Sequence, residues 1–341
     1  KMSDSPVNVI TTIQFSEPLM AVLQAVSPRL RFLVRPARRP EDVENEDWAN
    51  AEIIYTDRVL PLPTQTPQLK WLQFHFAGID FALDAPLLQK DDLLVTTLSG
   101  AATPQMAEYA VMMMLALGHG MRDIMANQEK GEWPRDRWER FAPHELRGST
   151  VGIIGYGSIG REIARLLKPW GVTILAVKKD LRHPEDQGYC IPGLGDPAGD
   201  LFDRLYPVQA LRSVMAKSDY VIMLLPLSRE TRNLVGAEHL AVMKPSAYLI
   251  DMGRGGVVDQ AALLTALQER KFSGAALDVF SDEPLPPGSP FWRLPNVIVS
   301  PHIGGISLAY RERAIAMFAE NLRRYLAGQP LLNLYDARRG Y

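Results

Sequence analysis

The sequence contains a single cysteine, Cys190, among 341 residues. One cysteine cannot form an internal disulfide, and it excludes zinc sites that are built from several cysteines. A lone free thiol is typical of proteins in a reducing compartment, so we expect a cytoplasmic location.

The sequence also lacks a large excess of charge and a long hydrophobic run. The formal net charge is −2 at pH 7, which argues against nucleic acid as a partner. The densest apolar stretch, Tyr109–Leu117, is too short to cross a bilayer and is expected to form a buried helix. The first fifteen residues show no cationic segment followed by a long apolar run, so no signal peptide is expected. We therefore expect neither nucleic acid nor a membrane as a partner.

Apolar residues make up 47% of the chain, and its length is sufficient for two domains. Strand-like apolar runs alternate with helical patterns, which predicts an α/β fold with parallel sheets. The expected strands are Val7–Ile13, Leu30–Val34, Ile53–Tyr55, Trp71–Phe76, Leu93–Thr97, Val151–Ile154, Val172–Val177, Tyr220–Leu225, Ala247–Ile250, Gly274–Leu277 and Val297–Val299. Long helices are expected over 104–130, beginning at Pro104, and over Leu308–Leu326, while the Gly- and Pro-rich residues 188–207 are expected to form an irregular loop.

A glycine-rich turn follows the run Val151–Ile154 directly, and a helical pattern and a second apolar run follow the turn. This order predicts a βαβ unit that binds a dinucleotide. In such a turn, Gly155 allows the tight bend, Gly157 lets the backbone approach a pyrophosphate, and Gly160 lets helix and strand pack closely. The free N–H groups at the start of the helix would hold the phosphates. The alternative is a tight turn without a ligand.

Polar residues follow three of the expected strands, at the sheet edge where α/β proteins bind ligands. Arg254 stands between glycines, and its guanidinium could hold a carboxylate through two parallel hydrogen bonds, or could neutralise a helix end. Asp278 and Glu283 belong to an acidic segment that could equally be a solvated loop. His302 precedes two glycines and could exchange protons near neutral pH. No role is expected for the other histidines: His75, His119, His144, His183 and His239.

The motifs and their order resemble the D-isomer-specific 2-hydroxyacid dehydrogenase family over residues 65–335. The resemblance implies that Arg254, Glu283 and His302 are catalytic. It implies that Phe76, Ala77 and Gly78, in LKWLQFHFAGID, receive the substrate carboxylate. The cofactor-binding residues that it implies are Gly155, Tyr156, Gly157, Ser158, Ile159, Gly160, Pro226 and Asp278, with Asp278 near the nicotinamide carboxamide.

The family fold implies two Rossmann-like α/β domains with parallel sheets. A flavodoxin-like substrate domain would comprise residues 1–102 and 306–341, and a dinucleotide-binding domain residues 103–305. The chain would cross between them on the helices that begin near Pro104 and Leu308. The family also implies a homodimer that pairs through the nucleotide domains. Trp133 and Trp138 would contribute to that interface, unless they pack within one chain.

The residues suggest a mechanism for reducing a 2-keto acid. Arg254 and the amides near Gly78 would bind the carboxylate, and Arg254 would polarise the carbonyl. His302, as an imidazolium, would donate a proton to the carbonyl oxygen while hydride arrives from the nicotinamide. Glu283 would hydrogen-bond the other imidazole nitrogen and favour its protonated form. No metal is required.

The expected cofactor is NADP(H) in preference to NAD(H). NAD enzymes place an acidic residue at the end of the second strand, where it binds the ribose hydroxyls. This chain has Lys178 there, eighteen residues after Gly160, and Lys179 follows. A lysine attracts a 2′-phosphate that a carboxylate would repel. In the alternative, both lysines are solvated and Asp180 binds the ribose.

Two classes of function remain open. The first is an oxidoreductase acting on a small 2-keto acid of the glyoxylate or hydroxypyruvate type. The second is a non-catalytic, nucleotide-sensing regulator, which some family members are. Phosphite and formate dehydrogenases share the fold, although Glu283 argues against a formate dehydrogenase. The substrate side chain depends on pocket residues around Phe74–Phe81 and is not decided by the sequence. The 188–207 loop is longer than usual in the family, and we interpret it as a surface insertion rather than a cover over the adenine.

Overall fold

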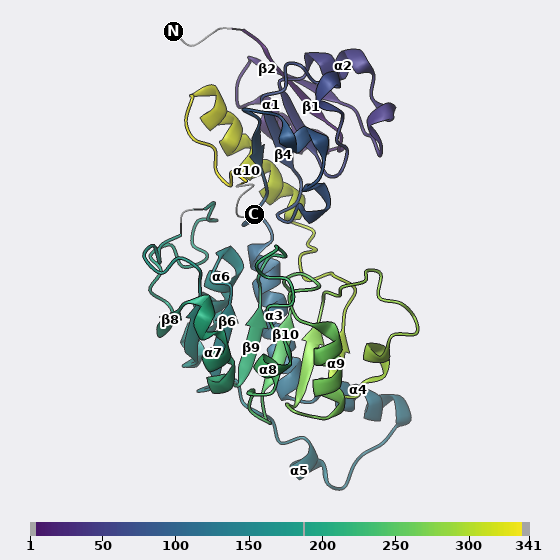
Figure 1. The fold of residues 1–341 in the computed structure, drawn as a ribbon, viewed down its shortest axis with the longest axis vertical. Helices are drawn as coiled ribbons and strands as arrows, with labels where there is room; N and C mark the ends of the chain where they lie inside the picture. Colours follow the sequence, from purple (N-terminus) through teal and green to yellow (C-terminus); the bar gives the residue numbers. More distant parts are fainter. Residues whose placement is uncertain (1–4, 187, 336–341) are drawn as a thin grey trace. The chain divides into compact units, whose positions relative to one another are not determined.

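The computed structural model describes residues 5–186 and 188–335, which form two compact units (Figure 1). Unit 1 comprises Lys1–Ala101 and Ser307–Tyr341, and unit 2 comprises Ala102–Ile306. The predicted domain boundaries differ from these by one residue at each crossing. The outermost residues of the predicted substrate domain, 1–4 and 336–341, lie outside the described residues. No helix in the described part of the chain is long and apolar enough to cross a membrane.

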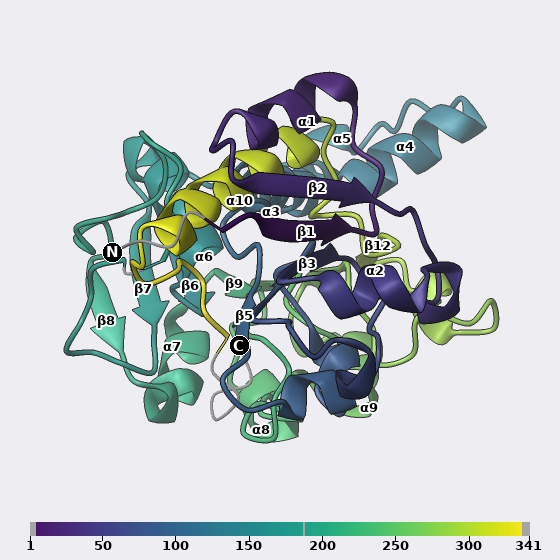
Figure 2. The same ribbon diagram turned by 90° about the horizontal axis from the view of Figure 1, so that it is seen from above.

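Unit 1 contains a five-stranded parallel sheet in the order β2-β1-β3-β4-β5, the order of flavodoxin-like folds. Its strands are β1 (Val7–Thr11), β2 (Leu30–Val34), β3 (Ile53–Thr56), β4 (Trp71–Phe74) and β5 (Leu94–Thr96). Helices α1 (Glu17–Gln24) and α10 (Tyr310–Leu326) pack on one face, and α2 (Asn45–Asn50) lies on the other (Figure 2). Helix α10 therefore packs in the same hydrophobic core as residues of β1 and α1.

Unit 2 contains a seven-stranded parallel sheet in the order β12-β11-β10-β9-β6-β7-β8, a Rossmann order extended by one strand. Its strands are β6 (Thr150–Ile154), β7 (Thr173–Val177), β8 (Arg204–Tyr206), β9 (Tyr220–Met223), β10 (Tyr248–Asp251), β11 (Gly274–Leu277) and β12 (Val297–Val299). Its helices are α3 (Thr103–Gly118), α4 (Met121–Lys130), α5 (Arg137–Arg140), α6 (Ser158–Leu167), α7 (Leu211–Lys217), α8 (Ala237–Leu240) and α9 (Gln260–Gln268). The two units also contain short 3-10 helices, at Pro40–Asp42, Pro63–Gln65, Asp80–Ala82, Pro86–Gln89, Lys168–Trp170, Val208–Ala210 and Pro290–Arg293.

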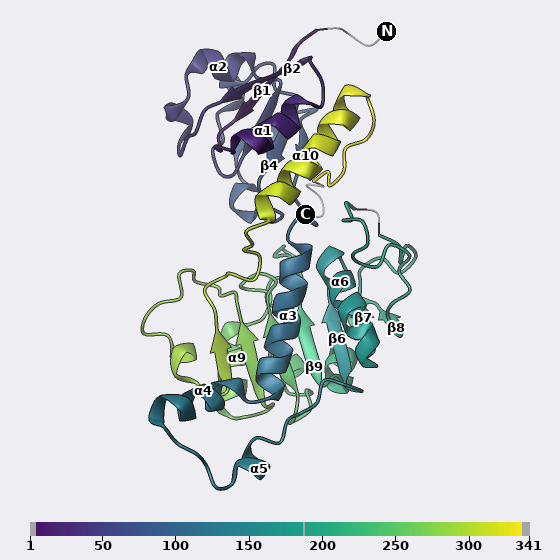
Figure 3. The same cartoon turned by 180° about the vertical axis from the view of Figure 1, so that it is seen from behind.

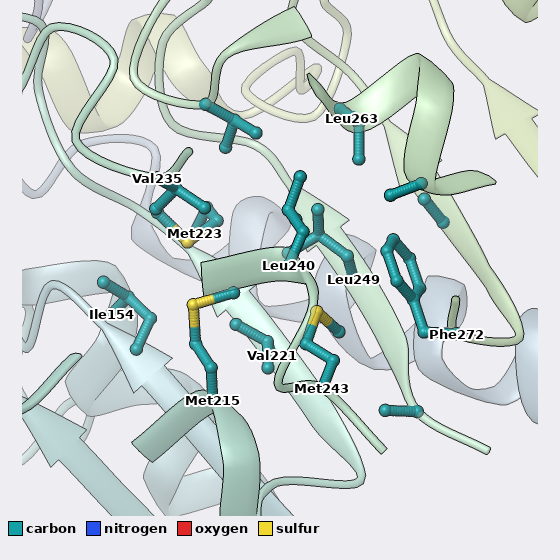
Figure 4. Packing of buried hydrophobic residues seen from close by; sticks show 14 of the residues in the cluster. Ile154, Met215, Val221, Met223, Val235, Leu240, Met243, Leu249, Leu263 and Phe272 are labelled. Atoms are coloured by element: carbon teal, nitrogen blue, oxygen red, sulfur yellow. The ribbon is translucent and has the colours of Figure 1, made fainter. Parts of the chain in front are cut away.

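Two hydrophobic layers enclose the sheet of unit 2. Helices α3 and α6 cover one face (Figure 3), and α7, α8 and α9 cover the other. Figure 4 shows the second layer, in which Met215, Leu240 and Phe272 meet side chains of the central strands. Both faces of the sheet are buried, which explains why its strands are nearly continuous apolar runs.

The predicted α/β class and parallel sheets are confirmed, and each expected strand is present to within about two residues at either end. Two predictions are wrong. The helix expected over 104–130 is divided into α3 and α4, because Gly120 adopts a left-handed conformation with φ of 62°. The loop expected over 188–207 ends in strand β8, which pairs with β7 at the sheet edge. Three residues are too few to show a strand pattern.

Candidate active site

The predicted catalytic residues follow three neighbouring parallel strands of unit 2. Strand β10 pairs with β11, and β11 pairs with β12, so their carboxyl ends lie at one edge of the sheet. Arg254 follows β10, Glu283 follows β11 and His302 follows β12. Sequence order and parallel pairing therefore bring these three turns to the same edge.

His302 and Glu283 are in direct contact. The Nδ1 atom of His302 lies 2.8 Å from the Oε2 atom of Glu283. The other carboxylate oxygen of Glu283 accepts a hydrogen bond from the backbone amide of Phe280 at 2.9 Å, which fixes the carboxylate. Both side chains are partly exposed, at 43% for His302 and 35% for Glu283. With Nδ1 held in this way, Nε2 remains as the nitrogen that can exchange a proton with a ligand.

Arg254 lies on the adjacent turn and is half-buried. Its Nη1 atom donates a hydrogen bond to the carbonyl of Gly253 at 2.9 Å. A Cβ atom on Gly255 would lie 1.8 Å from the carbonyl oxygen of Phe280, so only glycine allows the two turns to approach so closely. This packing places the turn of Arg254 against the residue whose amide holds Glu283.

The buried carboxylate of Asp278 organises the turn that carries His302. Its Oδ1 atom accepts hydrogen bonds from the hydroxyl of Ser300 at 2.6 Å and from the amide of Ile303 at 2.9 Å. Its Oδ2 atom accepts a hydrogen bond from the amide of Gly304 at 2.9 Å. His302, between these anchors, has a positive φ of 53°. Three hydrogen bonds accepted by this one carboxylate hold the turn of His302 in that unusual conformation.

Two residues of this network were not predicted from the sequence as functional. The hydroxyl of Tyr109, on α3, forms a short hydrogen bond with the hydroxyl of Ser300. Burial raises the pKa of Tyr109 to about 12, so its hydroxyl stays protonated. Nothing in the sequence near Tyr109 indicates this contact, because Ser300 lies 191 residues further along the chain.

Asp251, the last residue of β10, is a second buried carboxyl group at this edge. Burial raises its pKa to about 7, and the neighbouring charge of Asp278 acts in the same direction. The backbone amide of Gly253 opposes the shift through a long contact of 3.4 Å. The two carboxyl groups thus have different environments, since among the described residues Asp278 has three close donors and Asp251 has one distant donor.

The glycine fingerprint forms the predicted strand, turn and helix. A Cβ atom on Gly160 would lie 2.6 Å from the carbonyl oxygen of Gly155, so glycine is needed where α6 packs on the turn. A Cβ atom on Gly157 would meet nothing within 4 Å, so the space above this residue is open. An open glycine at the start of a ten-residue helix suits the pyrophosphate of a dinucleotide. These residues therefore fit the predicted cofactor.

The other predicted cofactor-binding residues of this region lie at the same sheet edge. Ser158 and Ile159 begin α6, and Pro226 follows β9. The side chain of Tyr156 is buried, and its hydroxyl donates to Asp196 at 2.7 Å. The side chain of Tyr156 therefore packs inside unit 2 and stabilises the glycine-rich turn.

Lys178 and Lys179 follow β7, and both are engaged within the chain. The ammonium of Lys178 donates a short hydrogen bond to the carbonyl of His183. Partial burial, and then the positive charge of Arg161, lower the pKa of Lys178. Lys179 pairs with Glu230 at 2.7 Å, and both side chains are exposed. Asp180 lies 2.8 Å from the Nδ1 atom of His183.

The loop before β8 is anchored against α6 by a buried cluster that the sequence did not predict. Arg161 is 1% exposed and donates to the carbonyl of Asp196 at 2.7 Å and to that of Pro184. The Asp196 carboxylate accepts from Tyr156 and from the amides of Gly199, Asp200 and Leu201. Burial alone would raise the pKa of Asp196, but these hydrogen bonds lower it overall. The predicted insertion, residues 188–207, is therefore anchored at the buried Asp196, whereas most of its other residues are exposed or partly exposed.

The predicted substrate loop belongs to unit 1. Phe76, Ala77 and Gly78 follow β4, at the carboxyl edge of the unit 1 sheet. The carbonyl of Phe76 accepts a hydrogen bond from the amide of Leu98 at 3.1 Å. Within the described residues, the three backbone amides of this loop have no acceptor in the chain. Unsatisfied, neighbouring N–H groups are a suitable site for a carboxylate.

Among the described residues, no group of three or more His, Cys, Asp and Glu side chains is arranged to hold a metal ion.

The comparison with known families decides the assignment of the chain. The family model "D-isomer specific 2-hydroxyacid dehydrogenase, NAD binding domain" matches residues 111–304, more than half of the chain. The chain belongs to the D-isomer-specific 2-hydroxyacid dehydrogenase family. It is therefore an oxidoreductase of the NAD(P)-dependent D-2-hydroxyacid dehydrogenase type.

Individual relatives agree with this assignment. The chain is 35% identical to a glyoxylate reductase of Thermofilum pendens over 77% of its own length and 74% of the relative. It superposes, with a TM-score of 0.79 and 29% identity, on a D-isomer-specific 2-hydroxyacid dehydrogenase of Xanthobacter autotrophicus solved with NADPH and MES, covering 99% and 100% of the two chains. It also superposes, with a TM-score of 0.79 and 27% identity, on the NADPH-dependent glyoxylate/hydroxypyruvate reductase of Sinorhizobium meliloti solved with NADP and sulfate, covering 98% and 100%.

Proposed function

We propose that the protein interconverts a small 2-keto acid of the glyoxylate or hydroxypyruvate class and the corresponding 2-hydroxy acid. The observation that carries the proposal is the hydrogen-bonded pair of His302 and Glu283 at the sheet edge that also holds Arg254. The similarity to glyoxylate and glyoxylate/hydroxypyruvate reductases supports the substrate class.

In this proposal, His302 is the general acid and base. As an imidazolium it donates the proton on Nε2 to the carbonyl oxygen of the keto acid, and as neutral imidazole it removes a proton from the hydroxyl in reverse. Glu283 holds Nδ1 and stabilises the imidazolium, while the Phe280 amide holds Glu283. Asp278 keeps the turn of His302 in its left-handed conformation. When bound, the nicotinamide supplies the hydride.

Arg254 and the loop Phe76–Gly78 bind the substrate carboxylate. The guanidinium offers two parallel donors, and the loop offers backbone amides that have no acceptor within the described chain. The same guanidinium would polarise the carbonyl group and stabilise negative charge on its oxygen.

For the cofactor, we favour NADP(H) over NAD(H). Lys178 directly follows β7, at the position where a carboxylate would select NAD(H), and two similar structures were solved with NADPH or NADP. The competing interpretation places Asp180 on the ribose. The bonds of Asp180 to the amide of Arg182 and to His183 would then have to be exchanged for bonds to the ribose.

A steady-state screen of small 2-keto acids with NADPH and with NADH tests the proposal. We expect NADPH oxidation with glyoxylate, hydroxypyruvate or a close analogue. Cofactor binding should be measured in parallel by fluorescence. If both cofactors bind and no keto acid is turned over, the enzymatic proposal is wrong and the nucleotide-sensing regulator is the better interpretation.

A further inference from the structure

His75 is a buried histidine directly before the predicted substrate loop, and the proposed mechanism does not use it. It is 8% exposed and is surrounded by the rings of Tyr55, Phe15, Phe76 and Tyr310, with centroids 5.4–6.2 Å away. Its backbone is fixed at both ends, because its amide donates to the carbonyl of Thr56 and its carbonyl accepts from the hydroxyl of Tyr310. The position of the imidazole is therefore well defined.

The hydrogen bond between His75 and Tyr55 determines the tautomer of the imidazole. The Nδ1 atom of His75 lies 2.6 Å from the hydroxyl of Tyr55, which is fully buried. If Nδ1 carried the proton, the hydroxyl proton of Tyr55 would be buried without an acceptor. Tyr55 therefore donates to Nδ1, and the neutral ring carries its proton on Nε2.

The Nε2–H group of His75 is open to a ligand. It has no hydrogen-bond partner among the described residues. Among the described residues, the side-chain polar atoms that are fully buried and lack a hydrogen-bond partner belong to Thr103 and Arg161, and Nε2 of His75 is not one of them. It follows that Nε2 of His75 reaches the molecular surface, at the carboxyl edge of the unit 1 sheet beside Phe76.

The imidazole is neutral at working pH. Burial, and next the positive charge of Arg311, lower the pKa of His75 to about 4, with Asp57 opposing the shift. Burial also raises the pKa of Tyr55 far above its ordinary value. A neutral N–H donor suits a neutral oxygen such as a hydroxyl, whereas the loop amides and Arg254 already serve the carboxylate. His75 directly precedes the loop Phe76–Gly78 in the chain, so a small molecule that binds the loop amides lies close to this residue.

We infer that His75 is a specificity-determining residue, whose Nε2–H donates a hydrogen bond to an oxygen on C3 of the keto acid. The protein would then prefer a 3-hydroxylated substrate such as hydroxypyruvate over pyruvate, which lacks that oxygen. This inference rests on the proposed 2-keto acid reductase function. Such discrimination arises because binding pyruvate leaves the donor without an acceptor.

The test compares kcat/KM for hydroxypyruvate and pyruvate in three variants. His75→Phe should lower the hydroxypyruvate-to-pyruvate ratio by about three- to tenfold, mainly by lowering kcat/KM for hydroxypyruvate. His75→Gln keeps an N–H donor at a similar position and should retain much of the ratio. Phe15→Leu alters packing around the same ring without removing a donor, so it should leave the ratio unchanged. The wild-type ratio should be constant between about pH 6 and pH 8, since the ring stays neutral there.

Two results would overturn the inference while leaving the proposed function intact: an unchanged ratio in His75→Phe, or equal losses with both substrates. The latter would show that His75 only packs the loop. If His75→Phe fails to fold, the double variant Tyr55→Phe/His75→Leu replaces it as the protein without a donor. The inference would also be overturned if the hydroxypyruvate-to-pyruvate ratio of His75→Gln were as low as the ratio of this double variant. Absence of turnover with every keto acid in the wild-type protein would instead contradict the proposed function, and this inference with it.

Discussion

At the scale of single residues, the pair of His302 and Glu283 carries the chemistry in our proposal. Their contact of 2.8 Å leaves Nε2 of the imidazole for the substrate. Glu283→Gln removes the negative charge that favours the imidazolium. We therefore expect its keto acid reduction to decline at a lower pH than that of the wild-type protein, with activity retained under acidic conditions. The measurement is kcat/KM against pH for both proteins.

The comparison variant is His302→Asn. General acid–base catalysis is typically worth about 10²–10⁴-fold, so kcat should fall by that factor at every pH while cofactor binding is kept. If the pH profile of Glu283→Gln matches the wild-type profile, Glu283 has a structural role only.

The ionisation of the buried Asp251 side chain affects the stability of unit 2. Its pKa is about 7 in the folded protein and near 3.8 when unfolded. Between these values the folded state binds a proton that the unfolded state releases, so stability is lost as pH rises towards 7. Asp251→Asn has no carboxyl group to ionise, so this variant should not lose stability in that way as the pH rises. We expect the gain in unfolding free energy over wild type to be about 2–3 kcal/mol larger at pH 8 than at pH 5.

Urea denaturation at the two pH values measures this effect. Asp123→Asn, which removes an exposed carboxylate in α4, is the matched control. A gain that is equal at pH 5 and pH 8 would show that Asp251 is ionised throughout this range, contrary to its burial.

At the scale of secondary structure elements, the turn after β7 selects the cofactor in our proposal. Lys178→Asp should abolish or reverse a preference for NADPH in kcat/KM, because it repels the 2′-phosphate and offers an acceptor to the ribose hydroxyls. The wild-type preference should be about tenfold and should shrink with added salt, since the site is close to the surface.

Asp180→Ala separates the two interpretations of this turn. If Asp180 binds the ribose, that variant loses NADH activity and Lys178→Asp has little effect. A wild-type preference for NADH together with this pattern would contradict the assignment to Lys178.

The loop before β8 depends on Asp196. Asp196→Asn leaves Arg161 with a weaker partner at a site where both side chains are almost completely buried. Breaking a buried ion pair typically costs about 3–5 kcal/mol, so we expect a loss near the lower end, as the amide retains some hydrogen bonds. Thermal unfolding provides the measurement. Asp200→Asn, on the same turn but exposed, should be nearly neutral. Equal effects of the two substitutions would refute the anchoring role of Asp196.

At the scale of the whole molecule, one apolar surface of unit 2 is consistent with the predicted homodimer. A hollow of about 860 Å³ lies along α3, lined mainly by Val111, Met112, Leu115, Met121, Leu166 and Trp170. Met112 is 51% exposed, and Trp133 and Trp138 are 83% and 74% exposed. The guanidinium of Arg137 lies over both tryptophan rings, which otherwise remain largely open to solvent. Apolar residues concentrated in this way are typical of interfaces between proteins.

We expect light scattering to give the mass of a dimer at micromolar concentration. Met112→Glu should shift the protein towards monomer, because it places a charge in the apolar surface. Val22→Glu, at a position of similar exposure on α1, should leave the mass unchanged. A monomeric mass for the wild-type protein would rule out the dimer.

The sequence by itself determined the features that depend on local pattern. Parallel strands were predictable because they are buried on both faces and appear as apolar runs. The fingerprint was predictable because its glycines meet backbone requirements within six residues. The turns of Arg254, Glu283 and His302 could be placed at one sheet edge because parallel strands all end on the same side.

Only the tertiary structure decided the contacts between distant segments. The bond of Tyr109 to Ser300, the anchoring of Asp196 by Arg161, and the tautomer of His75 set by Tyr55 each join residues that no local pattern relates. The neutral state of His75 and the raised pKa of Asp251 likewise depend on burial, which is a property of the packed unit. The local sequence pattern specifies which strand, helix or turn carries a side chain. The partners, charge state and accessible atoms of that side chain depend on the residues that the rest of the chain packs around it.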